Sequence, residues 1–329
     1  MTLRVSRRIM FAAPFVAATG AVEGQAEAAE GDFYTFLAGI RRDAIGRGIR
    51  ASTIDLAFRN AQFLPHVIDL DRKQPERVLT FTQYIAKVVT PQRKEDARRQ
   101  LAENRVLLDA VSRHYNVEPN IMVALWGLES DFGRLPGNIP TISALATLTY
   151  DGRRGAYFRS ELMAALRILD RGDIRVDEMI GSWAGAMGGP QFMPSSYLDY
   201  AVDWDGDGRR DIWNSRGDVL ASIANYIRGL GWRGGQSWGQ DVLLPSGFNL
   251  GFAGLNARRP TGEWSRLGVR SIDAGPLAAR ESDASLVMPE GVNGPALLVY
   301  ANFRAIMKWN PSTYFAVSVG YLADSMARG

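Results

Sequence analysis

The sequence contains no cysteine. The chain therefore cannot form a disulfide, use a thiolate nucleophile or bind a metal through thiolates. Histidine is nearly absent as well, since only His66 and His114 are present. Two histidines give little support to a histidine-based metal centre.

Long apolar runs and strongly basic runs are also missing. After residue 30 no stretch is long enough to span a bilayer, and no basic run with interleaved aromatic residues resembles a nucleic-acid-binding module. The 329 residues carry a net charge of only +3, which predicts mild attraction to anionic partners such as nucleic acid or a cell-wall polymer with peptide carboxylates. Without a basic module, we expect no nucleic-acid partner. The chain is long enough to bury a substantial core, in one large domain or in several subdomains.

Residues 1–30 have the composition of an export signal. A basic start that includes Arg7 and Arg8 precedes the apolar stretch Met10–Val22, and Ala26–Ala28 fits a small-x-small cleavage site. The paired arginines leave both the general and the twin-arginine export routes open. We expect processing near Ala28 and, because cysteine is absent, no lipoprotein anchor. The mature protein is expected to be exported, soluble and periplasmic, without a transmembrane anchor.

The remaining chain divides by pattern into a helical part at 31–115, a core at 116–239 and a smaller part at 240–329. The helical part ends in what we expect to be one long amphipathic helix, Lys94–Tyr115. The last part has short alternating runs that predict strands at Leu267–Val269 and Ala296–Tyr300, followed by a closing helix at Ser312–Met326. We therefore predict an α+β fold that is mainly α.

Glu129 is the first candidate for catalysis. Ile121–Gly133 has apolar residues at helical spacing, and Glu129 falls in the last turn, beside the apolar stripe. Partial burial and the negative end of the helix dipole both disfavour a charged carboxylate. We therefore expect a raised pKa, as a general acid near neutral pH requires. The alternative is a solvated helix-end glutamate that pairs with Arg134, and the stretch taken alone favours this alternative.

The segment Gly181–Tyr200 combines glycines, neutral polar groups and aromatic rings. Ser182 and Gln191 supply hydrogen-bonding groups of the kind that bind sugar hydroxyls and acetamides. The glycines allow the backbone to approach a ligand closely, or else serve tight packing of a helix–loop–helix. The composition leaves both interpretations open.

The segment Asp203–Trp213, with the sequence DWDGDGRRDIW, has the spacing of an EF-hand-like loop extending over 203–218. Asp203, Asp205 and Asp207 occupy positions 1, 3 and 5, and Arg209 supplies a backbone carbonyl at position 7. Asn214 replaces the bidentate glutamate of position 12, and we expect Asp218 to act in its place. Hard oxygen ligands favour Ca²⁺, with Na⁺ as an alternative, in a structural role.

Three blocks together resemble one known family. ALWGLESDFGR, ATLTYDGRRGAYF and GSWAGAMGGPQFMPSSYLDYAVDWDGDGRRDIW resemble the lytic murein transglycosylase B family in sequence and in order. The resemblance runs from about Tyr84 to the C-terminus and is densest between Ala124 and Trp232. It implies that residues 31–329 form one lytic transglycosylase unit, with a lysozyme-like catalytic core at 116–239.

The resemblance also implies roles for individual residues. Glu129 falls on the single catalytic acid, and Asp218 on the last ligand of the metal loop. Arg153 and Arg154 fall on a pair that meets the stem peptide, for which the planar guanidinium fork is suited. The residues expected to line the glycan cleft are Tyr84, Arg153, Arg154, Tyr157, Ser182, Gln191, Tyr226, Tyr300 and Asn302.

The implied reaction is a carbon–oxygen lyase reaction on peptidoglycan. Glu129 protonates the oxygen between MurNAc and GlcNAc, then removes the proton of the sugar's C6 hydroxyl, so that a 1,6-anhydro ring closes without water. No cofactor is required for this chemistry. The expected partners are glycan strands with stem peptides, with cell-wall synthesis proteins as further candidates, and we expect a monomer.

Two other functions stay open at this point. A hydrolytic muramidase would use Asp131 or Glu161 as a second carboxylate, although Glu161 is expected on a separate charged surface. A non-catalytic peptidoglycan-binding protein would use Glu129 only at the helix end. The mass of the product distinguishes a hydrolytic muramidase from a lytic transglycosylase, because anhydro products lack one water. The sequence decides neither internal versus terminal cleavage nor the need for stem peptides.

Overall fold

The computed structural model describes residues 23–72, 79–277 and 283–327. Most of the predicted export segment, residues 1–22, lies outside the described residues. The chain packs as two compact units, each built from two separate stretches of sequence. We call the stretches 23–72 and 129–222 the acid unit, and the stretches 79–128 and 223–327 the sheet unit. The three-part division expected from the sequence remains a prediction.

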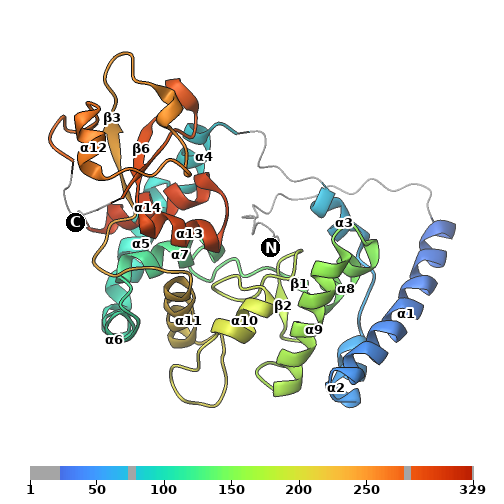
Figure 1. The fold of residues 1–329 in the computed structure, drawn as a ribbon. Coiled ribbons are helices and arrows are strands. Elements are labelled where there is room, and N and C mark those ends of the chain that lie inside the picture. The colour runs from blue at the N-terminus through green and yellow to red at the C-terminus, as the bar shows by residue number, and fades with distance from the viewer. Residues whose placement is uncertain (1–22, 73–78, 278–282, 328–329) are drawn as a thin grey trace. The chain divides into compact units, whose positions relative to one another are not determined.

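The acid unit is organised around one buried helix. All residues from Thr141 to Thr149 of α8 (Thr141–Asp151) are buried, and helices α1, α3 and α9 pack against it. A helix that is enclosed on all sides must belong to a core. Figure 1 shows α8 beside α9, to which it is joined by a turn with Gly152 in the left-handed conformation. The remaining elements of the acid unit are α1 (Glu23–Gly46), α2 (Ala51–Phe58), α3 (Pro65–Arg72), β1 (Ile139–Pro140), α9 (Gly155–Arg171), β2 (Ile180–Gly181) and α10 (Pro194–Tyr200).

Two helices cross from one unit into the other. The boundaries fall between Leu128 and Glu129 in α7 (Pro119–Ser130) and between Ser222 and Ile223 in α11 (Arg216–Gly229). Glu129 and Ser130 are therefore the two residues of α7 that belong to the acid unit.

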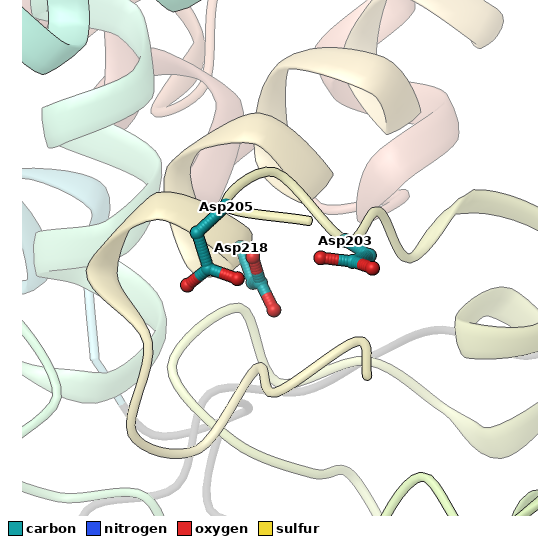
Figure 2. A group of neighbouring side chains, drawn as sticks. All are labelled: Asp203, Asp205 and Asp218. Atoms are coloured by element: carbon teal, nitrogen blue, oxygen red, sulfur yellow. The ribbon is translucent and has the colours of Figure 1, made fainter. Parts of the chain in front are cut away.

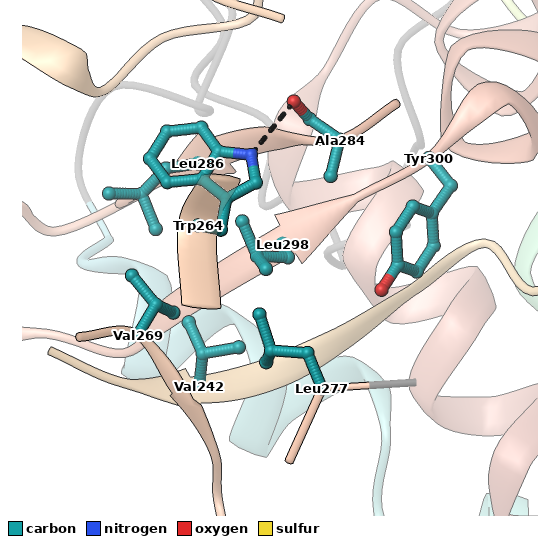
Figure 3. Close-up of a cluster of buried hydrophobic side chains, with 8 residues drawn as sticks. All are labelled: Val242, Trp264, Val269, Leu277, Ala284, Leu286, Leu298 and Tyr300. Carbon is teal, nitrogen blue, oxygen red and sulfur yellow. Dashed lines mark hydrogen bonds between the residues drawn. The ribbon is translucent and has the colours of Figure 1, made fainter. Parts of the chain in front are cut away.

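The sheet unit contains a four-stranded antiparallel sheet in the order β4–β3–β6–β5. A cluster of buried side chains packs on this sheet around Trp264, whose Nε1 donates to the carbonyl of Ala284 at 3.2 Å (Figure 3). The strands are β3 (Gly239–Leu243), β4 (Arg270–Ser271), β5 (Ser285–Val287) and β6 (Ala296–Val299). The fold is mainly helical with small sheets, as predicted.

The other elements of the sheet unit are helices and short turns. Thr90 caps α5 by accepting a hydrogen bond from the backbone N–H of Arg93 at 3.1 Å, and Pro91 follows as the first helical residue. The elements are α4 (Phe81–Val88), α5 (Pro91–Glu103), α6 (Arg105–Tyr115), η2 (Leu250–Phe252), α12 (Thr261–Arg266), η3 (Gly291–Asn293), α13 (Ala301–Trp309) and α14 (Thr313–Ala327). Within the described residues no helix is long and apolar enough to cross a membrane.

Two expected boundaries were wrong. The single helix expected at Lys94–Tyr115 is two helices, because the chain breaks at Asn104, whose side-chain amide donates to the carbonyl of Gln100 at 2.8 Å. The strand expected at Leu267–Val269 begins at Arg270, because α12 occupies the chain up to Arg266. The strand at Ala296 and the closing helix are confirmed to within one residue.

Asp170 ties α9 to the start of α2 within the acid unit. Its Oδ1 accepts hydrogen bonds from Thr53 Oγ1 at 2.6 Å and from Arg50 Nε at 2.7 Å. Burial alone raises the pKa of Asp170, but the bonds from Thr53 and Arg50 outweigh it and hold the pKa below its usual range. A depressed pKa in the folded state means that ionised Asp170 stabilises the fold.

We therefore expect Asp170→Asn to lower the free energy of unfolding by about 1 kcal/mol at neutral pH, because charge-assisted hydrogen bonds are lost at a partly exposed site. The difference from wild type should be present above the unfolded pKa of about 3.9. It should disappear as the pH falls through the folded pKa. Urea unfolding between pH 7 and 3 measures it. Asp55→Asn, which removes an exposed pair with Arg41, is the control and should change little. An unchanged stability of Asp170→Asn at pH 7 would contradict the assignment.

Candidate active site

Glu129 lies one residue before the end of α7 and is half-buried. The residues before it, from Ile121 to Leu128, are buried, so the carboxyl-bearing end of the helix emerges from an apolar stretch. The helix-end position agrees with the sequence prediction, although α7 ends at Ser130, before the expected stop at Gly133. The raised pKa of Glu129 remains a prediction.

The chain leaves α7 through an unusual turn. Asp131, Phe132 and Gly133 all have positive φ angles, of 52°, 58° and 82°. Two of these are not glycine, and a left-handed conformation costs such residues about 1–2 kcal/mol each. The turn is held by Ser130, whose Oγ accepts from the Gly133 N–H at 3.0 Å and donates to the carbonyl of Gly189 at 2.6 Å.

The segment that receives this hydrogen bond is Gly181–Phe192, which folds back on itself through backbone pairing at Met187. Its glycines pack against the protein itself. A Cβ on Gly185 would lie 2.5 Å from a methyl carbon of Leu145, and one on Gly188 would lie 2.4 Å from the carbonyl oxygen of Ile212. Of the two interpretations left open by the sequence, the structure supports steric packing at these positions.

Gln191 joins the same segment to the chain just after Glu129. It is 8% exposed, has a φ of 50°, and its Nε2 donates to the carbonyls of Pro136 and Gly188 at 2.8 and 3.0 Å. Ser182 is also buried, and its Oγ accepts from the N–H of Ala186 at 3.0 Å. Ser182 and Gln191 therefore shape the segment that Ser130 contacts.

Glu161 was expected on a charged surface, and this was wrong. It is 3% exposed, on α9, and its two oxygens accept from the Ser195 N–H at 2.9 Å and the Ser195 hydroxyl at 2.8 Å. Ser195 lies in the first turn of α10, so Glu161 satisfies a backbone donor at the start of that helix. Glu161 is buried where α9 packs against α10, so its carboxylate does not belong to the charged surface.

Arg153 and Arg154 both contact Asp71, whose side chain is 1% exposed. Arg153 Nε donates to Asp71 Oδ2 at 2.7 Å, and Arg154 pairs with Oδ1. The Arg154 guanidinium also lies over the ring of Phe158, 4.7 Å from its centroid. The side chains of Arg153 and Arg154 are 47% and 22% exposed, so Arg153 keeps the larger contact with solvent. Tyr157, on the next turn, is half-buried.

The other residues expected in the cleft belong to the sheet unit. Tyr84 and Tyr226 are nearly buried and pack against Tyr314 and Trp309 respectively. Tyr300 is 2% exposed and belongs to the cluster on the sheet (Figure 3). Its hydroxyl contacts the side-chain amide of Gln240. Tyr300 thus has a core position next to the sheet, and its expected place at the lip of the cleft remains a prediction.

Asn302 makes hydrogen bonds within the sheet unit, and its expected contact with the glycan remains a prediction. Its Nδ2 donates to the carbonyls of Arg233 and Gln236 at 2.9 and 2.8 Å, and its Oδ1 accepts from the Arg233 N–H. The side chain is fully buried. Both amide hydrogens are used, so Asn302 stabilises the turn at 233–236.

Three of the expected metal ligands come together. Asp203, Asp205 and Asp218 each place a carboxylate oxygen within 4.8 Å of the others (Figure 2). Asp218 is fully buried, and burial first, then the charges of Asp205 and Asp203, raise its pKa above the usual value. Asp207 lies outside this group and accepts from the Arg209 N–H at 2.8 Å. Ligation by Asp207 and by the Arg209 carbonyl remains a prediction.

Backbone donors fix the shape of this loop. Asp218 accepts from the N–H groups of Trp204 and Asp211, and Asp203 accepts from those of Gly206 and Gly208. Oxygen ligands on a loop held in this way fit a hard cation such as Ca²⁺.

The geometry can now be compared with known proteins. The profile of the Transglycosylase SLT domain matches residues 32–324. The chain belongs to this family. It is 34% identical over 236 residues to the membrane-bound lytic murein transglycosylase B of Escherichia coli K12. That match covers 67% of this chain and 60% of the relative, so it spans less than two thirds of the relative's length.

Solved structures of the family are similar to the whole described chain. SltB3 from Pseudomonas aeruginosa, solved in complex with NAG-anhNAM-pentapeptide, is 46% identical, with a TM-score of 0.88 over 90% of this chain and 80% of that one. The lytic transglycosylase Slt35 from Escherichia coli, solved with calcium, is 28% identical. Its TM-score is 0.77 over 89% of this chain and 92% of that one.

Sequence reasoning missed Ser130 and Asp71. Ser130 was visible only as the residue after Glu129, and its partner Gly189 lies 59 residues away. Asp71 lies in an ordinary charged stretch, IDLDRK, that carries no signal of burial.

We expect replacement of both Arg153 and Arg154 by Ala to lower the free energy of unfolding by about 3 kcal/mol, because a buried carboxylate loses its cations. Adding Asp71→Ala to this variant should restore much of the loss, since no buried charge is then left unpaired. Denaturant unfolding of the wild type and of these two variants forms the test. If the triple variant is no more stable than the double variant, the two arginines do not act by offsetting the buried charge of Asp71.

Proposed function

We propose that the protein is a peptidoglycan lytic transglycosylase in which Glu129 acts first as acid and then as base. The observation that carries the proposal is the setting of Glu129: half-buried, at the end of a buried helix, on a turn held rigidly by Ser130. Membership of the Transglycosylase SLT family and the bound anhydro-sugar ligand of SltB3 support the reaction type.

The mechanism needs only one carboxyl group. Protonated Glu129 donates to the glycosidic oxygen between MurNAc and GlcNAc, and the substrate's acetamide stabilises the resulting oxocarbenium-like centre. The Glu129 carboxylate then accepts the proton of the C6 hydroxyl, whose oxygen attacks C1 and closes the 1,6-anhydro ring. The nucleophile is tethered within the sugar, so no activated water is required.

The positions of the two other candidate carboxylates favour this mechanism over hydrolysis. Asp131 lies in the left-handed turn after α7, and its Oδ2 pairs with Arg134 Nε at 2.8 Å. Glu161 is buried against Ser195 at the start of α10. Hydrolysis requires a second carboxylate as nucleophile or as base for water, and both candidates already serve other contacts.

Neutral polar groups beside the acid are proposed to bind the sugar. The Nε2 group of Gln191 is fully used, while its Oε1 accepts no hydrogen bond from the described residues. An amide oxygen of this kind suits the N–H of an N-acetyl group. Ser182 and Tyr157 are proposed as further contacts to the glycan.

Arg153 is proposed to meet the stem peptide through its exposed face. The ligand of SltB3 carries a pentapeptide, and a guanidinium can hold a carboxylate bidentately. Export to the periplasm, where peptidoglycan lies, is proposed from the composition of residues 1–30.

The acidic loop is proposed to bind one Ca²⁺, as calcium binds Slt35. Asp203, Asp205 and Asp218 would hold the ion, and its positive charge would offset three neighbouring carboxylates, one of them fully buried. The role is structural.

Glu129→Gln should fold normally and lose about 10²–10⁴-fold in turnover or more, because one residue serves both proton transfers. Asp131→Asn and Glu161→Gln should lose much less. Turnover of purified peptidoglycan, with mass analysis of the products, measures both points. Near-normal activity of Glu129→Gln, or products ending only in reducing muramic acid, would show that the mechanism is wrong.

Calcium should raise the melting temperature of the wild type, because it binds only the folded loop. Asp205→Ala should lose this response, whereas Asp199→Ala, which removes an exposed carboxylate outside the loop, should keep it. Scanning calorimetry with added calcium or with a chelator measures the melting temperatures of the three proteins. Identical melting of wild type and Asp205→Ala in excess calcium would exclude a metal site.

Arg153→Ala should reduce turnover of peptide-bearing glycan more than of peptide-free glycan, because only the former offers a carboxylate. Comparing kcat/KM on the two substrates is the measurement. Arg167→Ala serves as control, because Arg167 lies on α9, after the turn that carries Arg153, and donates to the backbone carbonyl of Arg47. Equal losses on both substrates would assign Arg153 to structure alone.

A further inference from the structure

Ser130 connects the end of α7 directly to the Gly181–Phe192 segment. Its hydroxyl is 1% exposed and makes two hydrogen bonds, one to the turn after Glu129 and one to the carbonyl of Gly189. The backbone carbonyl of Ser130 accepts a further bond from the Leu135 N–H at 2.8 Å. The residue next to the proposed acid is therefore fixed from three directions.

Gly189 links Ser130 to the acidic loop through hydrogen bonds of its own backbone. Its N–H donates to the carbonyl of Ile212 at 2.8 Å, while its own carbonyl accepts from Ser130. Ile212 is fully buried, and Gly188 packs so closely on its carbonyl that only glycine fits there. The contact thus has little room to shift.

Ile212 is in turn set by Asp218. The N–H of Asp211, the residue before Ile212, donates to Asp218 Oδ2 at 2.7 Å. Asp211 Oδ1 then accepts from the N–H groups of Trp213 and Asn214 at 3.0 and 2.8 Å, which closes the turn around Ile212. A continuous series of short contacts therefore runs from Asp218 through Ile212 and Gly189 to Ser130.

We propose that Ser130 is a positioning residue through which the acidic loop fixes the place of the Glu129 carboxyl. The inference rests on the proposed catalytic role of Glu129. Ser130 donates its only hydroxyl hydrogen to Gly189, so it transfers no proton to substrate. It acts by holding the last turn of α7 against a segment that the loop keeps in place. Misplacement of a catalytic group by about 1 Å can reduce the rate about 10²-fold.

The first test is Ser130→Ala, which removes both hydrogen bonds of the hydroxyl. We expect kcat to fall about 10–100-fold, with KM within about twofold, because the displaced group acts in the chemical step. Ser130→Thr keeps the hydroxyl and should recover most of the lost kcat. The matched control is Ser143→Ala, which removes another buried serine hydroxyl of the acid unit, bonded to the N–H of Gln62 at 3.1 Å. If Ser130→Ala does not fold, Ser130→Cys, a weak donor of similar size, takes its place.

The second test asks whether the loop acts through Ser130. Asp218→Asn should lower kcat several-fold in the wild type, but should add less than about twofold in the Ser130→Ala background. Amide exchange of Leu135 provides a readout that does not depend on activity. Asp218→Asn should accelerate this exchange when Ser130 is present and leave it unchanged in Ser130→Ala.

The outcomes separate this inference from the proposed function. A kcat of Ser130→Ala within twofold of wild type, or a loss no greater than in Ser143→Ala, overturns the positioning role. Multiplicative losses in the double variant, or unchanged Leu135 exchange in Asp218→Asn, overturn the connection to the loop. In each of these cases a collapse of turnover in Glu129→Gln leaves the proposed function standing.

Discussion

The hydrogen bond from Ser130 to Gly189 is the contact on which the arrangement around Glu129 depends. It joins the end of α7 to a segment 59 residues further along the chain. The turn it holds contains two left-handed residues that are not glycine, Asp131 and Phe132. Such a turn persists only where its surroundings determine it, and here they do so through Ser130, Gln191 and the close packing of Gly188.

The features that the sequence predicts well are local. The closing helix, the strand at Ala296 and the helix end at Glu129 follow from periodicity and from apolar spacing, which depend on neighbours a few residues away. The family resemblance added the predicted role of Glu129 as the acid, whereas the spacing of the aspartates alone predicted the metal loop. The break at Asn104 escaped prediction because a single asparagine in a charged helix carries little signal.

The side-chain contacts that the sequence did not predict have partners that are distant in sequence. Asp71 is buried only because Arg153 and Arg154, 82 and 83 residues away, cover it. Glu161 is buried because Ser195 brings an unsatisfied helix N–H to it. The side-chain amide of Asn302 is hydrogen-bonded to a turn 69 residues earlier in the chain. A motif places a residue type, but the supply of hydrogen bonds in the folded chain decides whether its polar atoms remain available for substrate.

The same reasoning explains how the acid unit distributes its negative charge. In this unit the buried Asp71 pairs with two arginines, Asp173, whose side chain is 8% exposed, pairs with Arg210, and the buried Glu161 is held by Ser195. Asp218 differs, since it is met by backbone N–H groups and by two further carboxylates. A buried carboxylate next to like charges is the place where a bound cation stabilises most. The turn at Ile212 lies between the acidic loop and the segment that contacts Ser130. The N–H of the neighbouring Asp211 donates to Asp218, and the carbonyl of Ile212 accepts from Gly189. The charge balance of the loop and the position of Glu129 therefore both depend on this turn.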